Sequence, residues 1–347
     1  MRGRLPAAGG VLGAALVLGW ALPAAAQEAA APQSAAQPVT RCQISDPRLV
    51  ELSGLVDVGD RVLAINDGGD QLAVYALDGA CQVADVHTAA VDPYDPEDMA
   101  VGADGTVWLA DTGDNNANRP TVALHALRPD GSTSLYRLTY PDGPHDSEAL
   151  LLAPDGTPYL VTKEVLGASA VYRPAVALAD GGTVAMAKVA AVNLTLTGTP
   201  GGPAGRAGQL MVTGGAVARD GLHLALRTYT DAYVWPLTGS DVVGALAADP
   251  VRVALPASPQ GEAISFTADS QQLVVASEGT PSALTVVPVP AAAAAAGTTA
   301  PGVVPSLTDF TSSGLSPITT GLIAAAVATL AVWLGGKLRP RSRTDRL

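Results

Sequence analysis

The sequence predicts an all-β fold, a β-propeller of five four-stranded blades, followed by one C-terminal transmembrane helix. Three observations lead to this prediction. Between residues 41 and 290 the apolar segments are short, rich in β-forming residues and separated by Gly and Asp. A turn signal recurs along this region at long, blade-like intervals. Near the C-terminus, residues 310–336 contain no charged residue.

The N-terminus has the features of a secretory signal peptide over residues 1–26. Arg2 and Arg4 precede an apolar run at residues 11–22, and small residues at 24–26 suit cleavage. An N-terminal membrane anchor is the alternative, but the apolar run is only about 12 residues long, too short to span a bilayer. Residues 27–40 are rich in Ala, Gln and Pro and are predicted to form a flexible leader.

Five turn signals divide residues 41–290. Their aspartates are 44, 51, 65 and 49 residues apart, and each turn lies between two apolar strands: Asp60, Asp104, Asp155, Asp220 and Asp269. This spacing is typical of four-stranded propeller blades. Six blades is the alternative, if the interval of 65 residues hides another blade. The extra residues of this interval, compared with the others, fall in the Gly/Pro-rich residues 197–209, which we expect to form a loop.

The strand order is the same in the units that can be followed most easily. In the first unit the expected strands are residues 53–59, 61–67, 72–78 and 81–86, and in the second they are 97–105, 106–111, 122–129 and 132–140. Cys42 precedes the first inner strand, and Cys81 falls in the first outer strand. An exported chain with two cysteines usually pairs them, so we predict a disulfide, with two buried free thiols as the alternative.

The residues seven positions before each turn aspartate all carry a side-chain oxygen. They are Ser53, Glu97, Glu148, Thr213 and Glu262. The inner strands of a propeller line its central channel, so these five residues are expected to form a ring at the channel mouth. Carboxylates and hydroxyls without His or Cys favour Ca²⁺ over Zn²⁺. The alternative is a wide channel in which the glutamates are separated and solvated.

The residues about seven positions after each turn aspartate return to the same end of the hairpins. Asp111 and Arg227 belong to this set, and Asp114, Arg119 and Lys163 are expected at the same rim. If the chain is an enzyme, Arg119, Lys163 and Arg227 would stabilise phosphate charge. Asp111 or Asp114 would orient a water molecule.

The series around Ser53, Glu97, Glu148 and Glu262 ("SGL", "PEDM", "SEAL", "GEAI") resembles exported propellers of the phytase-like or esterase-like kind. It also resembles the calcium-activated nucleotidases (apyrases), which are five-bladed. The resemblance implies a central Ca²⁺ held by a ring ordered Ser, Glu, Glu, Ser, Glu. This chain differs only at the fourth position, where Thr213 keeps the hydroxyl. No match to the nucleotide-binding residues of that family is found.

The C-terminal region predicts a membrane tether. Residues 291–316 form an Ala/Pro/Thr-rich stalk, residues 317–336 a transmembrane helix, and residues 337–347 a basic tail. Five basic residues in the tail predict that this end is cytoplasmic and that the N-terminal domain is extracytoplasmic, in a single-pass protein of the cell membrane. A sorting tail that is cut and replaced is the alternative, but no LPxTG-like motif supports it.

The net charge of the chain limits the classes of partner that we expect. The whole chain has a net charge of −12, and without the two signal arginines and the six charged tail residues 13 basic and 31 acidic residues remain, or −18. Such a domain repels nucleic acid, so we expect no nucleic-acid partner. Two functions stay open. One is a calcium-dependent hydrolase of phosphate esters or anhydrides, acting on a phosphate-bearing small molecule. The other is a non-catalytic propeller that binds a ligand or a partner in the cell envelope.

Overall fold

Four of the five recurrent turn aspartates cap their own hairpins in the computed structural model, which describes residues 37–290, and in the first hairpin Asp57 accepts the Gly59 N–H instead. The Asp104 carboxylate accepts the Thr106 N–H at 3.0 Å, and the aspartates at 155, 220 and 269 do the same for the second residue after them. Gly105 has φ +82°, a left-handed conformation that glycine adopts without steric cost. Local turn chemistry therefore sets where each first strand ends and each second strand begins.

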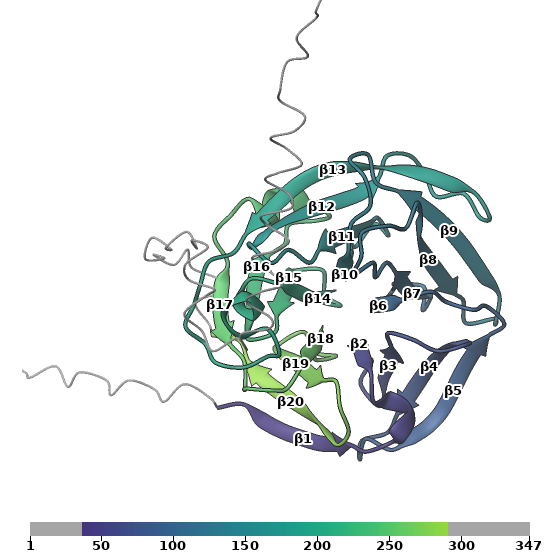
Figure 1. Cartoon of the computed structure of the whole chain (residues 1–347). Coiled ribbons are helices and arrows are strands. Elements are labelled where there is room, and N and C mark those ends of the chain that lie inside the picture. The colour runs from purple at the N-terminus through teal and green to yellow at the C-terminus, as the bar shows by residue number, and fades with distance from the viewer. Residues whose placement is uncertain (1–36, 291–347) are drawn as a thin grey trace, which may run out of the picture. The chain divides into compact units, whose positions relative to one another are not determined.

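Twenty strands occur in the described residues, and they form an all-β, propeller-like fold (Figure 1). The first sheet holds β2 (Leu52–Asp57), β3 (Val62–Asn66), β4 (Leu72–Leu77) and β5 (Val83–Ala89). An eight-stranded sheet follows, with β6 (Pro96–Val101), β7 (Val107–Asp111), β8 (Val122–Leu127), β9 (Thr133–Thr139), β10 (Ser147–Leu152), β11 (Pro158–Thr162), β12 (Ala168–Pro174) and β13 (Thr183–Asn193). Its two antiparallel halves join where β13 pairs with β9 in parallel.

Two four-stranded sheets complete the fold. One holds β14 (Val212–Val217), β15 (His223–Thr228), β16 (Asp231–Pro236) and β17 (Val251–Ala254). The other holds β18 (Gly261–Phe266), β19 (Gln272–Ser277) and β20 (Ser282–Pro288), and its fourth strand is β1 (Val39–Ile44). The N-terminal strand therefore completes the sheet built by the last three strands.

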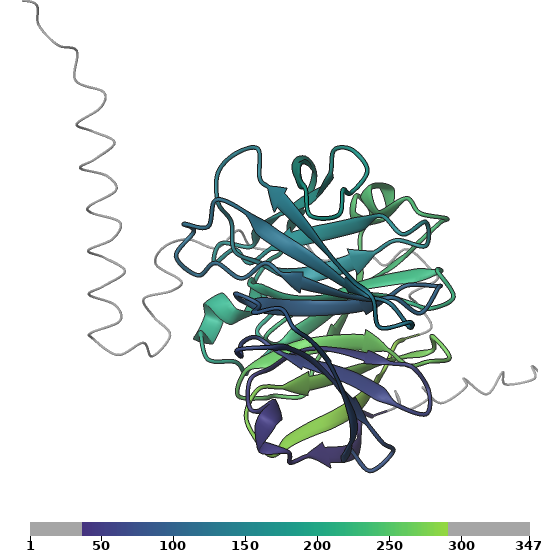
Figure 2. The same cartoon turned by 90° about the vertical axis from the view of Figure 1, so that its right-hand side faces the viewer.

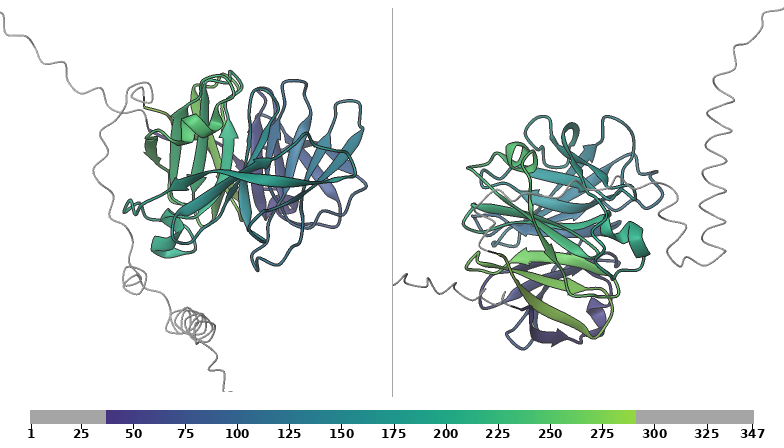
Figure 3. Two further views of the ribbon diagram at one scale, coloured as in Figure 1. Left: turned by 90° about the horizontal axis from the view of Figure 1, so that it is seen from above. Right: turned by 90° about the vertical axis from the view of Figure 1, so that its left-hand side faces the viewer.

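The strands β2, β6, β10, β14 and β18 lie nearest the centre (Figure 1). Each contacts the next in this order, and β18 contacts β2, so the five strands close a ring. Side views show the sheets packed face to face around this centre (Figure 2 and Figure 3). The apolar core accordingly falls into five clusters, each between neighbouring groups of strands.

The predicted disulfide is confirmed. Cys42 and Cys81 are bonded, with their Cα atoms 5.8 Å apart. The sequence predicts Cys81 within the first outer strand, but the residue lies in the turn before β5. Its N–H closes this turn on the Asp78 carbonyl at 2.9 Å. Since Cys42 lies in β1, the bond joins the last sheet to the first.

Little helix accompanies the strands. The described residues contain α1 (Val242–Leu246) and two 3₁₀ turns, η1 (Pro47–Leu49) and η2 (Gly205–Gln209). Residues 197–209 contain η2 and no strand, so the loop predicted there is confirmed. No helix within residues 37–290 is long and apolar enough to cross a membrane. The predicted signal peptide, stalk, transmembrane helix and basic tail lie outside the described residues.

Candidate metal centre

The five predicted ring residues occupy one equivalent position in the five central strands. Each is the second residue of its strand: Ser53 in β2, Glu97 in β6, Glu148 in β10, Thr213 in β14 and Glu262 in β18. In all five hairpins the register between the first and second strand shifts at this residue. A residue at a β-bulge leaves the regular ladder, and its side chain can be redirected. None of the five is more than 4% exposed.

The two hydroxyl residues bind the backbone of the neighbouring central strand. The Ser53 hydroxyl donates to the Glu97 carbonyl and lies 3.3 Å from Glu97 Oε2. The Thr213 hydroxyl donates to the Gly261 carbonyl at 3.0 Å. These contacts connect β2 to β6 and β14 to β18 at the level of the ring. The hydroxyls therefore help to hold the ring together, and their oxygens retain lone pairs that can accept or coordinate.

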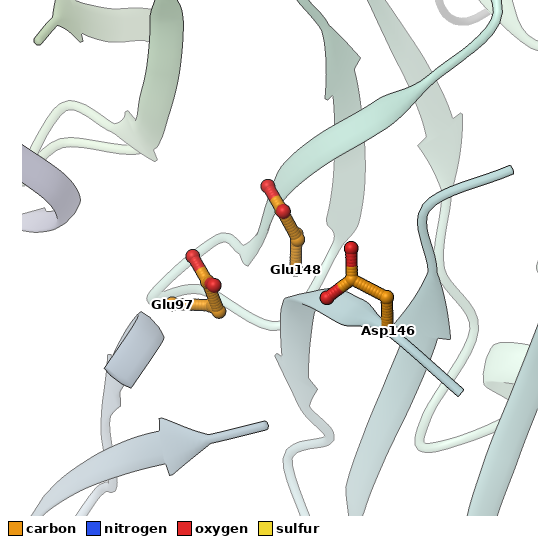
Figure 4. Close-up of side chains that lie close together, drawn as sticks. All are labelled: Glu97, Asp146 and Glu148. Carbon is orange, nitrogen blue, oxygen red and sulfur yellow. The ribbon is translucent and has the colours of Figure 1, made fainter. Parts of the chain in front are cut away.

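Three carboxylates gather at one side of the ring, from Glu97, Asp146 and Glu148 (Figure 4). Each offers an oxygen that lies within 4.8 Å of the other two. Glu148 Oε1 accepts a hydrogen bond from the Lys163 ammonium, whereas Glu148 Oε2 is buried without a hydrogen-bond partner. An orphaned carboxylate oxygen in a dry site is costly, and a bound cation is one way to offset that cost.

The pKa values of the ring carboxylates also show that their negative charge is poorly compensated by the protein. Burial, together with the charges of Glu148 and Asp95, raises the pKa of Glu97 well above its usual range. Burial also raises the pKa of Glu148 to about 8, although Lys163 opposes this shift. The pKa of Glu262 rises to about 8 through burial and its contact with Glu278. With these raised pKa values, some of the ring carboxylates are protonated near neutral pH when no metal ion is bound.

A second tier of side chains surrounds the ring. It comes from the residues that directly follow the second strand of each hairpin: Asp67, Thr112, Lys163, Tyr229 and Glu278. Burial and neighbouring carboxylates raise the pKa of Asp67 to about 7. The Tyr229 hydroxyl lies 3.5 Å from Glu262 Oε1, and the Lys163 ammonium lies 5.5 Å from the centre of the Tyr229 ring.

Asp146 is a member of the carboxylate cluster that sequence reasoning missed. It lies two positions before Glu148, and its carboxylate also accepts the Asp114 N–H at 2.8 Å. A signal for it is present in the sequence. The positions two before the ring residues are Glu51, Asp95, Asp146, Met211 and Gln260, of which four carry side-chain oxygens. The same count that identified the ring could therefore have identified this second series.

Asp111, predicted to orient a water molecule, is held by protein donors. Its carboxylate accepts from Arg119 Nη2 at 2.8 Å, from the Tyr94 N–H at 3.0 Å and from the Asp95 N–H at 3.0 Å, and lies 3.2 Å from His125 Nε2. Burial alone would raise its pKa, but the donors outweigh burial and lower it to about 2. Asp111 is therefore an ionised residue that anchors the segment entering β6.

Asp114 and Arg119 shape the loop after β7. The Asp114 carboxylate accepts the N–H groups of Asn118 at 3.0 Å and Arg119 at 2.7 Å. The Arg119 guanidinium donates to the Gly113 carbonyl at 2.7 Å and lies over the Tyr94 ring at 4.3 Å. Gly113 has little room, because a Cβ there would lie 2.1 Å from Glu97 Oε1. The loop backbone thus packs directly on the carboxylate cluster.

Arg227 is buried beside Gly261 and bonded to backbone carbonyls, so its predicted contact with phosphate at the rim stays a prediction. The residue is 1% exposed, and its guanidinium donates to the carbonyls of Thr228 at 3.1 Å, Ala263 at 2.8 Å and Ala276 at 3.1 Å. The hairpin register fixes the backbone position of Arg227, and the packed neighbours decide which groups its guanidinium contacts. Among the three predicted phosphate-binding cations, only Lys163 contacts the ring glutamates through a hydrogen bond.

The donors of the centre are hard oxygen ligands, which suit Ca²⁺. Glu97, Asp146 and Glu148 would hold the ion, with Glu262, Ser53 and Thr213 completing the ring around it. When bound, the ion would supply positive charge and an electrophilic coordination position. The residues of the chain supply its charge balance and keep the site largely out of water.

No family model matches this chain, and no curated protein matches it. Solved structures are similar to it. They include a gluconolactonase from Xanthomonas campestris at 20% identity, covering 70% of this chain and 73% of that one, with a TM-score of 0.41. Virginiamycin B lyase from Staphylococcus aureus is 14% identical, covers 73% and 74%, and has a TM-score of 0.35. The PQQ-bound aldose sugar dehydrogenase of Streptomyces coelicolor is 12% identical, covers 72% and 98%, and has a TM-score of 0.39. The phytase-like or nucleotidase family is not confirmed by these comparisons.

Proposed function

We propose that this chain is a membrane-tethered, extracytoplasmic β-propeller of five blades whose centre binds one Ca²⁺ ion and whose role is to bind a ligand or a partner in the cell envelope. The observation that carries the metal site is the buried, unpartnered Glu148 Oε2, which belongs to a cluster with Glu97 and Asp146. Taking each half of the eight-stranded sheet as one blade supports the count of five.

Binding is favoured over phosphate-ester hydrolysis because of how the basic residues are used. Arg119 and Arg227 donate to protein oxygens, and Lys163 is paired with Glu148. A phosphate would find mostly carboxylates around the ion, and these would repel it. The hydrolase prediction has a direct test, which is calcium-dependent release of phosphate from a panel of nucleotides and phosphate esters. Turnover of any of them would replace the binding proposal.

Calorimetric titration of the purified ectodomain with Ca²⁺ tests the metal site. We expect saturable binding of one ion, and a higher melting temperature by linkage, about 2.7 kcal/mol of stabilisation at 100 times the dissociation constant. Glu148→Gln and Asp146→Asn should each weaken binding by roughly tenfold or more, since each removes a charged ligand.

Asp155→Asn is the matched control, because Asp155 is a carboxylate in a hairpin turn seven residues along the chain from Glu148. It should leave the affinity unchanged. Absence of Ca²⁺ binding by the wild-type domain, after dialysis against a chelator, would contradict the proposal.

The membrane tether is tested by reporter fusions. We expect a reporter placed after Leu347 to be active only in the cytoplasm and one inserted near Gly297 only outside it, because the basic tail should stay inside. The reverse pattern would reject the proposed localisation.

A further inference from the structure

Lys163 is held inside the centre from three sides. It directly follows β11, and its N–H donates to the Asp146 carbonyl at 2.9 Å. Its ammonium bonds Glu148 Oε1 and lies 5.5 Å from the centre of the Tyr229 ring. Only 10% of the side chain is exposed. The geometry therefore fixes one positive charge of the protein itself beside the carboxylate cluster.

The two carboxylate oxygens of Glu148 have different environments. One of its oxygens is taken by the Lys163 ammonium, and the other is buried without a partner. An ion bound at the cluster would share the Glu148 carboxylate with the lysine. Because both are cations a few ångströms apart in a poorly solvated site, they repel each other.

We propose that Lys163 determines the cation affinity and selectivity of the centre by acting as a built-in counter-ion on Glu148. This inference rests on the proposed function. Lys163 restricts Glu148 to one free oxygen and subtracts one unit from the negative charge that an incoming ion meets. The repulsion scales with the charge of the ion, so Lys163 disfavours trivalent ions more than divalent ones.

The purely structural alternative makes a different prediction. If Lys163 only satisfies a buried carboxylate, its loss should lower the stability of the fold and weaken every ion alike. A charge effect instead strengthens binding when the charge is removed, and strengthens it more for a trivalent ion. The ratio of two affinities therefore separates the two roles, whatever happens to stability.

The experiment compares Ca²⁺ and Tb³⁺ binding by calorimetry in the wild type, Lys163→Gln and Lys163→Arg. Gln can still donate to Glu148 but carries no charge, and Arg keeps the charge. We expect Lys163→Gln to bind Ca²⁺ roughly tenfold tighter or more. The gain for Tb³⁺, on a logarithmic scale, should be about one and a half times larger, following the ratio of ionic charges. Lys163→Arg should stay near the wild type.

Lys188→Gln is the matched control, since this lysine is 49% exposed and pairs with Asp142 at 3.5 Å. It should change neither affinity. Lys163→Met is a second neutral variant and is titrated in the same way, and Tb³⁺ luminescence sensitised by the nearby Tyr229 reports occupancy directly.

The outcomes are distinct. Equal or weaker binding by both neutral variants overturns the inference while the proposed metal site stands. Binding by the neutral variants but not by the wild type shows that Lys163 itself is the resident cation, which supports the inference and rejects a native calcium site. No binding by any form rejects both.

Discussion

At the scale of single residues, the balance between burial and the surrounding donors and charges decides the pKa of a buried carboxylate. Asp111 is surrounded by N–H donors, and its pKa is lowered to about 2. Glu148 has one ammonium and an orphaned oxygen, and burial raises its pKa to about 8. Both residues are almost fully buried. The first is satisfied by the protein, and the second is left for a proton or a cation.

Asp98 shows a third outcome directly beside the ring. It is fully buried, and its carboxylate accepts the N–H groups of Met99 and Leu150 at 2.8 Å and of Gly215 at 3.0 Å. These donors come from β6, β10 and β14, so one side chain connects three central strands. Burial still raises the pKa of Asp98 well above its usual range. Its position supports the strands that carry Glu97, Glu148 and Thr213.

Replacing Arg227 by Ala should lower stability. The substitution leaves three carbonyl groups in a buried region without their donor, and we expect the free energy of unfolding to fall by about 2–4 kcal/mol. Urea unfolding followed by circular dichroism measures this. Arg219→Ala is the control, because Arg219 makes one exposed hydrogen bond to the Val58 carbonyl and should cost less than about 1 kcal/mol. Equal stabilities for the two variants would show that Arg227 is not a structural residue.

At the scale of strands and hairpins, the same design is repeated around the ring. In four of the five hairpins the predicted turn aspartate caps the turn, and in all five a register shift at the other end of the hairpin occurs at the ring residue. Because the turn and the shift are separated by a constant length of strand, the redirected side chains reach the same level in every sheet. Closure is not repeated, since it depends on β1 pairing with β20 at one place only.

Removal of the disulfide should weaken this closure. Cys42 and Cys81 are 39 residues apart in sequence, and in the chain-entropy model a bond closing such a loop contributes about 3–4 kcal/mol. We expect the Cys42→Ser/Cys81→Ser variant to unfold at correspondingly lower urea concentration and to be cleaved first before β2 in limited proteolysis. Unfolding at the wild-type urea concentration would show that pairing of β1 with β20 alone secures the ring.

At the scale of the whole domain, buried carboxylates with raised pKa values are concentrated at the centre. Burial raises the pKa of Asp95 to about 6 and that of Asp67 to about 7, and both lie beside ring glutamates whose pKa values reach about 8. These groups all shift in one direction, so their effects on stability add. The net charge of −18 outside the signal and tail strengthens the attraction for cations from solution.

The metal-free domain should lose stability as pH rises from about 5 to about 8. Glu148 and Glu262 have higher pKa values when folded than when unfolded, so the folded state binds more protons across this range. Their stabilising contribution is complete below the unfolded pKa, near 4.3, and is lost as the pH passes the folded value. Asp111 has a lowered pKa, so its contribution to stability changes only below about pH 4 and does not affect the range from pH 5 to 8.

The measurement is a series of melting curves in chelator and in Ca²⁺. In chelator the melting temperature should fall with rising pH, by about 2–4 °C for each 1 kcal/mol lost. Saturating Ca²⁺ should remove most of the fall, because bound metal replaces the protons. A melting temperature in chelator that rises or stays level from pH 5 to 8 would contradict the raised pKa values.

The sequence by itself determined the repeated hairpins and, through them, the positions of the ring residues. Asp104 and Glu97 belong to one hairpin, and their separation depends only on local turn chemistry and strand length. The disulfide could be predicted as well, because only two cysteines are available to pair.

Only the tertiary structure decided which of these residues meet. The Arg227 guanidinium reaches the carbonyls of Ala263 and Ala276, and the Asp98 carboxylate reaches Gly215, across 36 to 117 residues of sequence. The gathering of Asp146 with Glu97 likewise depends on side-chain direction after the sheets have packed. Local patterns fix backbone register, but the direction of a long side chain and the burial of its charge depend on neighbours that are distant in sequence.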